Sequence, residues 1–353
     1  MGIFCEISLF KPSDGVYKPG QTVSGVIKYN VDEPMEVDKV IMSLKGIGRI
    51  VLTSNPGKHE SNFVSEESYV DIDTIIIDEH KEIAVGLYQI KFNYNLPQIL
   101  PSTLKFFKYF PGYKVKCSIK YYIRIKFEKP GLFVFNNHFR KTIQVKSEVA
   151  PRLSREPVIY GETKNLTHLF SFSDSIVNIK ATILNSAVPV GGKFEVHYEV
   201  QNNSQVVIKS IIVKLVEAYT FKAKGYHKVK YEEDIPGTET RTSSIECEDT
   251  LNNSIVVTAP SHIFSLSNAK IVARDFMIKI IAQLPLPHRN AVVSIPVQVG
   301  IFEENVDLNS CQQMSECVTY DDPPPSYWEA MGHTKKEDHS SDDEADEEKR
   351  RYL

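Results

Sequence analysis

The segment from Lys114 to Phe127 constrains the fold more than any other, because apolar and polar side chains alternate along its whole length. One face would carry Val115, Cys117, Ile119, Tyr121, Ile123, Ile125 and Phe127. The opposite face would carry Lys114, Lys116, Ser118, Lys120, Tyr122, Arg124 and Lys126. Successive side chains of a β-strand point to opposite sides of its sheet. The alternation therefore predicts one long strand with a buried face and a solvated face.

Shorter strands of the same kind are predicted before and after this one. They are Ile3–Leu9, Val23–Tyr29, Val40–Leu44, Ile143–Val145, Phe194–Val200, Ile211–Val216, Phe276–Ile281 and Val292–Val299. Turn-forming residues separate them, as in Asn55-Pro56-Gly57 and Pro111-Gly112. No segment before Gly300 keeps a helical period for three turns. Many short strands joined by turns favour β-sandwiches over a parallel sheet, so the predicted fold class is all-β.

An internal repeat divides this β-rich region. Gly20–Leu44 aligns with Gly191–Leu215 without a gap, and each copy consists of a glycine turn, a strand, a polar loop and a second strand. Any two β-hairpins share such a pattern, but the gapless length favours a duplicated domain. The repeat predicts two tandem sandwiches in one chain.

Four parts follow from the repeat and from shifts in composition. They are a first sandwich at residues 1–147, a linker at 148–171, a second sandwich at 172–302 and a tail at 303–353. The linker is too polar for a core strand. The tail is rich in Pro, Glu, Asp, Ser and Lys and cannot bury enough apolar surface to become ordered, so we expect it to be disordered.

The tail contains Pro323-Pro324-Pro325-Ser326-Tyr327, a pattern typical of ligands for WW domains. Proline holds φ near the polyproline II value, so the peptide loses little entropy when it docks. Tyr327 follows Pro324 by one turn of a three-fold helix and so lies on the same side, where it can fill a second pocket. Pro324, Pro325 and Tyr327 are therefore the predicted WW-domain contacts.

An acidic run, Asp342–Glu348, lies near the end of the tail, just after Ser340 and Ser341. Acidic residues shortly after a serine suit an acidophilic kinase, so both serines are predicted phosphorylation sites. Each would add about −1.5 to −2 charges. The alternative is a plain solvating tail.

A basic segment surrounds the long predicted strand. Lys105–Lys129 contains eight Lys or Arg residues and one acid, Glu128. Such a positive surface can bind anionic lipid headgroups or phosphorylated receptor tails. The candidate residues are Lys114, Lys116, Lys120, Arg124 and Lys126. The alternative is an ordinary solvated sheet face, on which lysines would also discourage pairing between sheets.

Nothing in the sequence indicates catalysis, a cofactor or a metal site. The ten histidines are scattered, and none forms a metal-spaced pair with cysteine or another histidine. There is no Gly-rich phosphate loop, nucleophile elbow or HExxH helix. The net charge of −4 is too small to suggest nucleic acid as a partner. We expect a non-enzymatic protein, and the alternative is an enzyme whose site is assembled in space.

Four sequence blocks, in this order, resemble the arrestin-domain-containing proteins, or α-arrestins. They are Val16–Gly25; Leu96-Pro97 with Leu100-Pro101-Ser102; Asn202-Asn203-Ser204 followed by Ile211–Leu215; and Ile295–Gly300. The resemblance covers about residues 1–302 and, through the tail motif, 320–330. It implies two tandem arrestin-like, immunoglobulin-like β-sandwiches followed by the tail.

The resemblance also implies an adaptor that links membrane receptors or transporters to a WW-domain HECT-type ubiquitin ligase of the Nedd4 class. Cargo would then be ubiquitinated and internalised or sorted. The five cysteines, an odd number, and the lack of a leading secretory signal predict a reducing compartment. We therefore expect a cytoplasmic protein that is recruited to the plasma membrane and endosomes. A retromer-like or scaffolding trafficking module without a ligase is the alternative.

Two features depart from the family pattern. The tail has one Pro-Pro-x-Tyr motif, whereas family members often have two. Ile271–Asp275 stands where a cysteine-containing block is expected. The first departure lowers the expected avidity for a ligase, and the second weakens any inference about the cargo surface.

Overall fold

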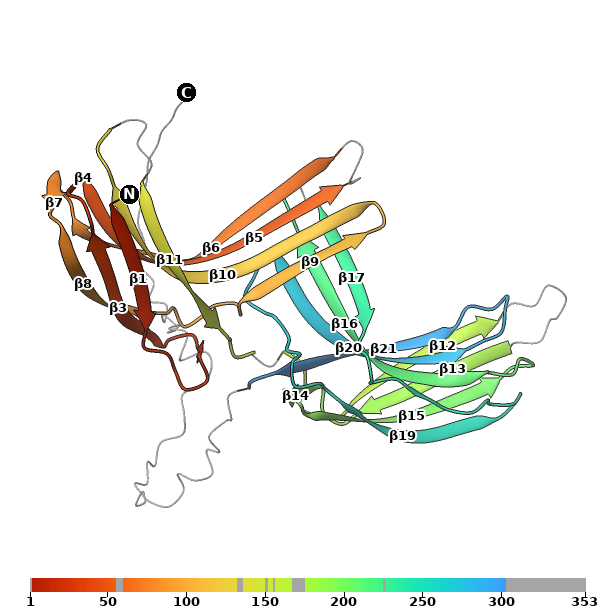
Figure 1. Cartoon of the computed structure of the whole chain (residues 1–353). Coiled ribbons are helices and arrows are strands. Elements are labelled where there is room, and N and C mark those ends of the chain that lie inside the picture. The colour runs from red at the N-terminus through yellow and green to blue at the C-terminus, as the bar shows by residue number, and fades with distance from the viewer. Residues whose placement is uncertain are drawn as a thin grey trace, which may run out of the picture. The chain divides into compact units, whose positions relative to one another are not determined.

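A computed structural model describes most of the chain up to residue 302. The described ranges are 2–54, 60–131, 136–149, 152–154, 156–166, 175–224 and 227–302. Every regular element within them is a β-strand (Figure 1), which confirms the predicted all-β class. The same ranges accordingly contain no helix that could cross a membrane.

The strands fall into two consecutive sets, each of which builds one sandwich. The first set is β1 (Ile3–Leu9), β2 (Val16–Tyr17), β3 (Thr22–Val31), β4 (Met35–Val37), β5 (Lys39–Ser54), β6 (Ser61–Ile77), β7 (Lys81–Ile83), β8 (Gly86–Asn95), β9 (Leu104–Phe110), β10 (Tyr113–Glu128) and β11 (Asn137–Val145). The second set is β12 (Val158–Leu166), β13 (Ser175–Ile183), β14 (Ala187–Pro189), β15 (Lys193–Asn203), β16 (Ser210–Lys222), β17 (Lys228–Asp234), β18 (Thr240–Arg241), β19 (Thr250–Thr258), β20 (Val272–Gln283) and β21 (Ala291–Gly300).

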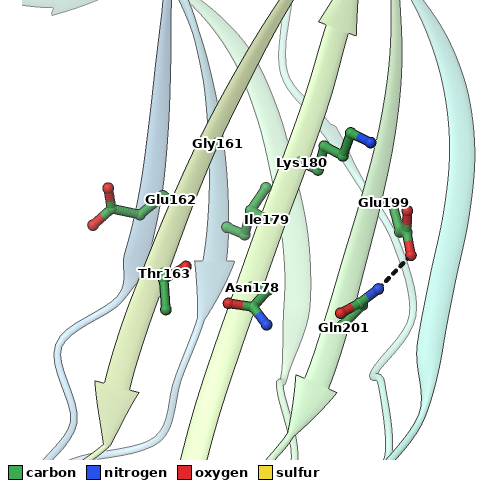
Figure 2. Close-up of a pocket in the computed structure, with 8 residues that line it drawn as sticks. All are labelled: Gly161, Glu162, Thr163, Asn178, Ile179, Lys180, Glu199 and Gln201. Carbon is green, nitrogen blue, oxygen red and sulfur yellow. Dashed lines mark hydrogen bonds between the residues drawn. The ribbon is translucent and has the colours of Figure 1, made fainter.

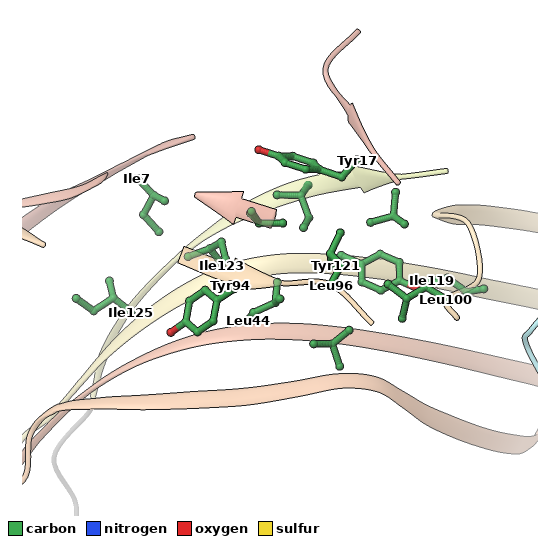
Figure 3. Packing of buried hydrophobic residues seen from close by; sticks show 14 of the residues in the cluster. Ile7, Tyr17, Leu44, Tyr94, Leu96, Leu100, Ile119, Tyr121, Ile123 and Ile125 are labelled. Carbon is green, nitrogen blue, oxygen red and sulfur yellow. The ribbon is translucent and has the colours of Figure 1, made fainter. Parts of the chain in front are cut away.

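Strand β10 is the centre of the larger sheet of the first sandwich. It pairs antiparallel with β5 along its whole length, with β11 along its C-terminal half and with β9 along its N-terminal half. Each of the seven side chains on its predicted buried face is at most 1% exposed, so that prediction is confirmed. Figure 3 shows four of them, Ile119, Tyr121, Ile123 and Ile125, within the cluster that fills this sandwich.

A shift in strand register lies beside this core. The pairing of β5 with β6 shifts between Gly46 and Ile47, so that Tyr69 of β6 is the extra residue of a bulge. A Cβ atom at Gly46 would lie 2.6 Å from the ring of Tyr121. That ring is fixed, because the Tyr121 hydroxyl donates to the carbonyl of Pro101 at 2.8 Å. The close approach therefore requires glycine at position 46.

The second sandwich repeats the strand order of the first. Its larger sheet runs β14-β21-β20-β16-β17, and the matching sheet of the first sandwich runs β2-β11-β10-β5-β6. In both, a short early strand joins the last strand in parallel. Gly20 and Gly191, which begin the two copies of the repeat, have φ angles of 78° and 79°. The shared order and turn favour a duplicated domain over a chance likeness of two hairpins.

Part of the predicted linker belongs to the second sandwich instead. Residues 158–166 form β12, which pairs with β13 along its whole length and is an edge strand of the sheet β12-β13-β15-β19. Of its side chains only Leu166 is fully buried. An edge strand with a solvated face needs few apolar residues, so polarity does not exclude a strand here. The linker prediction is wrong over this range.

The two sandwiches share one hydrophobic cluster inside the compact unit 1–303. Alternate side chains of β9 turn toward the second sandwich. The ring centroid of Phe106 lies 4.7 Å from those of both Tyr219 and Phe221, and that of Phe110 lies 4.8 Å from that of Tyr231. Rings from both sandwiches thus fill the junction between them.

Polar contacts cross the same junction. The carboxylate of Glu67 on β6 accepts hydrogen bonds from the backbone N–H groups of Lys270, at 3.0 Å, and Ile271, at 3.4 Å. Lys108 Nζ on β9 lies 2.8 Å from Glu233 Oε1 on β17. The junction therefore combines apolar packing with hydrogen bonds that fix its register.

Candidate functional site

Two of the predicted sites lie outside the described residues. They are the WW-domain contacts Pro324, Pro325 and Tyr327, and the phosphorylation sites Ser340 and Ser341. Both stay predictions. The third, the basic face of β10, lies on described strands and is the candidate site with known geometry.

The basic face of β10 is only partly solvated. Lys116 and Lys120 are exposed, whereas Lys114, Arg124 and Lys126 are half-buried. The reason is the place of β10 in the middle of its sheet, where side chains from neighbouring strands stand on both sides of it. The expectation of a fully solvated face is corrected accordingly.

Acidic neighbours neutralise one end of this face. Lys126 Nζ lies 2.7 Å from Glu128 Oε1, and Arg124 Nη2 lies 3.9 Å from Asp73 Oδ1. Burial opposes the charged form of Asp73, but the hydrogen bond from Lys45, at 2.8 Å, helps to outweigh it and lowers the pKa of that carboxyl. Arg124 and Lys126 are thus held by acids of their own sheet and are poorly placed to receive an anionic ligand.

The other end of the face keeps its positive charge. Lys114, Lys116 and Lys120 form no ion pair with any residue in the described ranges. Lys105 on β9 is likewise unpaired there, and it lies on the same face because it is opposite Ser118 in the β9–β10 register. The positive surface is therefore concentrated at this end of β10 and extends onto β9.

Two exposed aromatic side chains lie at the same end. Phe107 is opposite Lys116 and Tyr109 is opposite Lys114. Phe107 is 55% exposed and Tyr109 is 62% exposed. Neither residue was predicted from the sequence, because Leu104–Phe110 carries aromatic residues on both faces and so lacks a clear alternation. The hairpin turn that follows was the available signal that β9 pairs with β10.

Lys108, which lies between these aromatic residues in the sequence, points to the opposite side of β9. Its Nζ atom is 4.4 Å from the ring centroid of Tyr231 on the second sandwich. Its hydrogen bond to Glu233 lowers the pKa of that carboxyl. Lys108 therefore holds the junction and does not add to the exposed positive surface.

A polar hollow of about 370 Å³ lies on the outer face of the sheet that contains β12, β13 and β15 (Figure 2). Gly161 opens it, because glycine has no side chain to place opposite Lys180 in the β12–β13 register. On β15, Gln201 Nε2 donates to Glu199 Oε1 at 2.6 Å. The hollow is open to solvent and is not a deep pocket of the kind that the enzyme alternative predicts.

An adjoining hollow of about 560 Å³ contains a histidine and a serine. His197 Nε2 lies 3.5 Å from Glu195 Oε1, and Ser254 is the partner of His197 in the β15–β19 register. No hydrogen bond joins His197 to Ser254 in the described structure, and both residues are exposed. The group thus lacks the contact that activates a serine nucleophile. Nor do the described ranges hold three or more His, Cys, Asp or Glu residues grouped to bind a metal ion.

Comparison with known proteins gives two family matches and one curated relative. The family described as arrestin (or S-antigen), N-terminal domain, matches residues 5–150, and arrestin (or S-antigen), C-terminal domain, matches residues 173–303. Arrestin domain-containing protein 17 of Caenorhabditis elegans is 26% identical over 232 residues, which are 62% of this chain and 52% of the relative. The chain thus spans about half the length of that relative. With both sandwiches matched in order, the chain belongs to the arrestin-domain-containing family, whose members are generally non-enzymatic trafficking adaptors.

Proposed function

We propose that this protein is an adaptor that links membrane cargo to a HECT-type ubiquitin ligase of the Nedd4 class. The observation that carries the proposal is a single chain that joins two arrestin domains to the peptide Pro324-Pro325-Ser326-Tyr327. An adaptor needs one part for cargo and another for the effector, and this chain offers both. Ubiquitinated receptors or transporters would then be internalised or sorted, with the protein moving from the cytoplasm to the plasma membrane and endosomes.

The ligase end of the adaptor is assigned to the tail peptide. WW domains hold consecutive prolines of an extended peptide in an aromatic groove. Pro324 and Pro325 would occupy this groove, and Tyr327 would fill the neighbouring pocket. Because the chain has one such motif, it cannot gain the avidity that a second motif would provide. We expect binding to a single WW domain to set the affinity.

The cargo end is assigned to the two sandwiches. A recognition surface works best on rigid elements, and long paired strands such as β5 and β10 provide them. The junction packing of Phe106 on Phe221, together with the hydrogen bonds of Glu67, supports one continuous frame from both sandwiches. Cargo held on this frame would lie within reach of a ligase recruited by the tail.

The direct test is a binding titration of the full chain against isolated WW domains. Tyr327→Ala should weaken binding about thirtyfold, because loss of an aromatic anchor at a binding hot spot costs about 2 kcal/mol or more. Tyr320→Ala is the matched control, since Tyr320 is a tail tyrosine outside the motif. It should bind as the wild type does.

Two results would count against the ligase mechanism. Equal binding by Tyr327→Ala and the wild type would remove the tail peptide as the contact. Removal of residues 320–353 with unchanged turnover of cargo in cells would favour the trafficking module without a ligase. Loss of turnover with Tyr327→Ala, but not with Tyr320→Ala, is the expected outcome.

A further inference from the structure

The unpaired lysines and exposed aromatic residues of the β9–β10 hairpin form one continuous surface. We name it the aromatic–lysine face, and it consists of Lys105, Phe107, Tyr109, Lys114, Lys116 and Lys120. The rings of Phe107 and Tyr109 contact each other edge to face, with centroids 5.3 Å apart. Lys114 Nζ lies 5.6 Å from the centroid of the Tyr109 ring. Cations and aromatic rings are thus interleaved on one side of the sheet.

The exposure of Phe107 and Tyr109 is not explained by packing within the fold. On the other side of β9, Phe106 and Phe110 fill the junction with the second sandwich. Solvent-facing positions of a strand are normally polar, yet here both aromatic residues are more than half exposed. On the other side of Lys116, half-buried Val51 of β5 adds apolar surface to the same row of the sheet. Exposed apolar surface of this kind marks a site of interaction.

The charge of the face narrows the chemistry of its partner. Its four lysines have no acidic partner in the described ranges, and Glu66, an acid on the same side of the sheet, lies 3.2 Å from Arg49 instead. The partner must therefore supply negative charge. Phosphopeptide sites typically use arginine, whose planar fork matches a phosphate, and they have no need of exposed phenylalanine. Lysines around aromatic rings are better matched to a membrane surface.

We propose that the aromatic–lysine face binds the surface of an anionic lipid bilayer. Tyr109 would sit at the level of the headgroups, where its amphipathic ring is most stable, and the apolar ring of Phe107 would enter the boundary between headgroups and acyl chains. The lysines would lay their aliphatic stems along the same boundary and place their ammonium groups among anionic headgroups. This contact goes beyond the proposed ligase function and does not depend on the tail motif.

The first experiment measures binding of the full chain to vesicles by co-sedimentation. Vesicles of phosphatidylcholine alone are compared with vesicles that also contain phosphatidylserine. Each lysine near an anionic surface contributes roughly fivefold to binding, so the triple variant Lys114→Gln, Lys116→Gln and Lys120→Gln should bind about a hundredfold more weakly. The control is a second triple variant with the same change in net charge, in which exposed lysines of other sheets are replaced: Lys28→Gln, Lys91→Gln and Lys180→Gln.

The second experiment asks whether the aromatic residues themselves reach the lipid. Trp328 is the single tryptophan of the chain, so Trp328→Phe gives a background without tryptophan. Phe107→Trp in that background should show a blue-shifted emission with anionic vesicles and quenching by brominated lipids. Phe4→Trp is the control, because Phe4 is 69% exposed on a different sheet. It should show neither change.

The proposal is overturned by any of four results. The first is that the wild type fails to bind anionic vesicles, and the second is that the two triple lysine variants lose binding to the same extent. The third is that the emission of Phe107→Trp is unchanged in the bound protein. The fourth is that a multiply phosphorylated peptide binds the aromatic–lysine face while vesicles do not, which would make the face a phosphopeptide site. A matching unfolding midpoint in urea for each variant and the wild type excludes misfolding as the cause. Equal binding of Tyr327→Ala and the wild type to WW domains, which would refute the ligase proposal, leaves these vesicle measurements unchanged, so the two proposals fail separately.

Discussion

Phe221 offers a test of whether the two sandwiches are held together by their shared core. It lies on β16 of the second sandwich and is 0% exposed. Its ring centroid is 4.7 Å from that of Phe106 on β9, and the ring stacks on Tyr219 at 5.4 Å. Its side chain belongs to the hydrophobic cluster of the first sandwich. Phe221→Ala should therefore weaken the junction as well as its own sheet.

The expected loss of stability follows from its burial. Replacement of a fully buried phenylalanine by alanine costs about 3–5 kcal/mol. Phe106, which faces it, is half-buried and can partly move into the vacated space, so we expect a value near the lower end, about 3 kcal/mol. Phe194→Ala removes the same side chain from the core of the second sandwich, where Phe194 is also 0% exposed. Phe194→Ala should therefore lower the free energy of unfolding by a similar amount.

Two measurements distinguish the variants: unfolding in urea monitored by circular dichroism, and thermal unfolding in a calorimeter. The wild type and Phe194→Ala should each unfold in one transition, because the junction remains intact and couples the sandwiches. Phe221→Ala should unfold in two, because the sandwiches then lose their coupling. The reasoning would be refuted if Phe221→Ala unfolded in a single transition and lost less than about 1 kcal/mol of its free energy of unfolding. It would also be refuted if both variants unfolded in two transitions.

Two further predictions concern the first core. Gly46→Ala should destabilise the protein by about 1–3 kcal/mol in urea, because its Cβ would lie 2.6 Å from the immobile Tyr121 ring; Gly161→Ala, whose Cβ would have an ordinary 3.5 Å contact, should cost little. Burial, aided by the charge of Glu67, raises the pKa of the Cys117 thiol to about 12. The unfolded chain releases this proton near pH 8.5, so the stability from this group is complete below that pH and is lost as pH rises toward 12, by up to about 1.4 kcal/mol per unit. Cys117→Ala should show a shallower alkaline loss of stability, and equal slopes in the two proteins would contradict the assignment.

Much of the fold could be predicted from the sequence because its central strands are buried on one face. The alternation in β10 was sufficient to place its core residues, and the repeat indicated two copies of one arrangement. Strands β6 and β12 were missed because most of their side chains are exposed or half-buried, which leaves few apolar positions to show a period. Periodicity indicates a buried face, but β13 was missed as well, although its alternate side chains are buried.

The candidate site depended more on pairing between strands than on sequence. Lys126 lies two residues from Glu128, so its neutralisation could have been predicted along the strand. The neutralisation of Arg124 by Asp73 could not, because it depends on a third strand placed by the register of β5 and β6. In the same way, only the β9–β10 register brings Phe107 beside Lys116. Spatial pairing therefore divided a uniform basic stretch into a neutralised end and a charged end.

The hydrophobic cluster shared by the two sandwiches determines which part of the chain we expect to fold and unfold together. Residues of the first sandwich are covered by Tyr219, Phe221 and Ile271 of the second, and Glu67 holds the backbone beside Ile271. A chain cut near residue 150 would separate the two family domains, yet it would leave one half with an uncovered apolar sheet. The repeat is thus a unit of descent, whereas we expect the unit that unfolds cooperatively in the wild-type chain to be the pair.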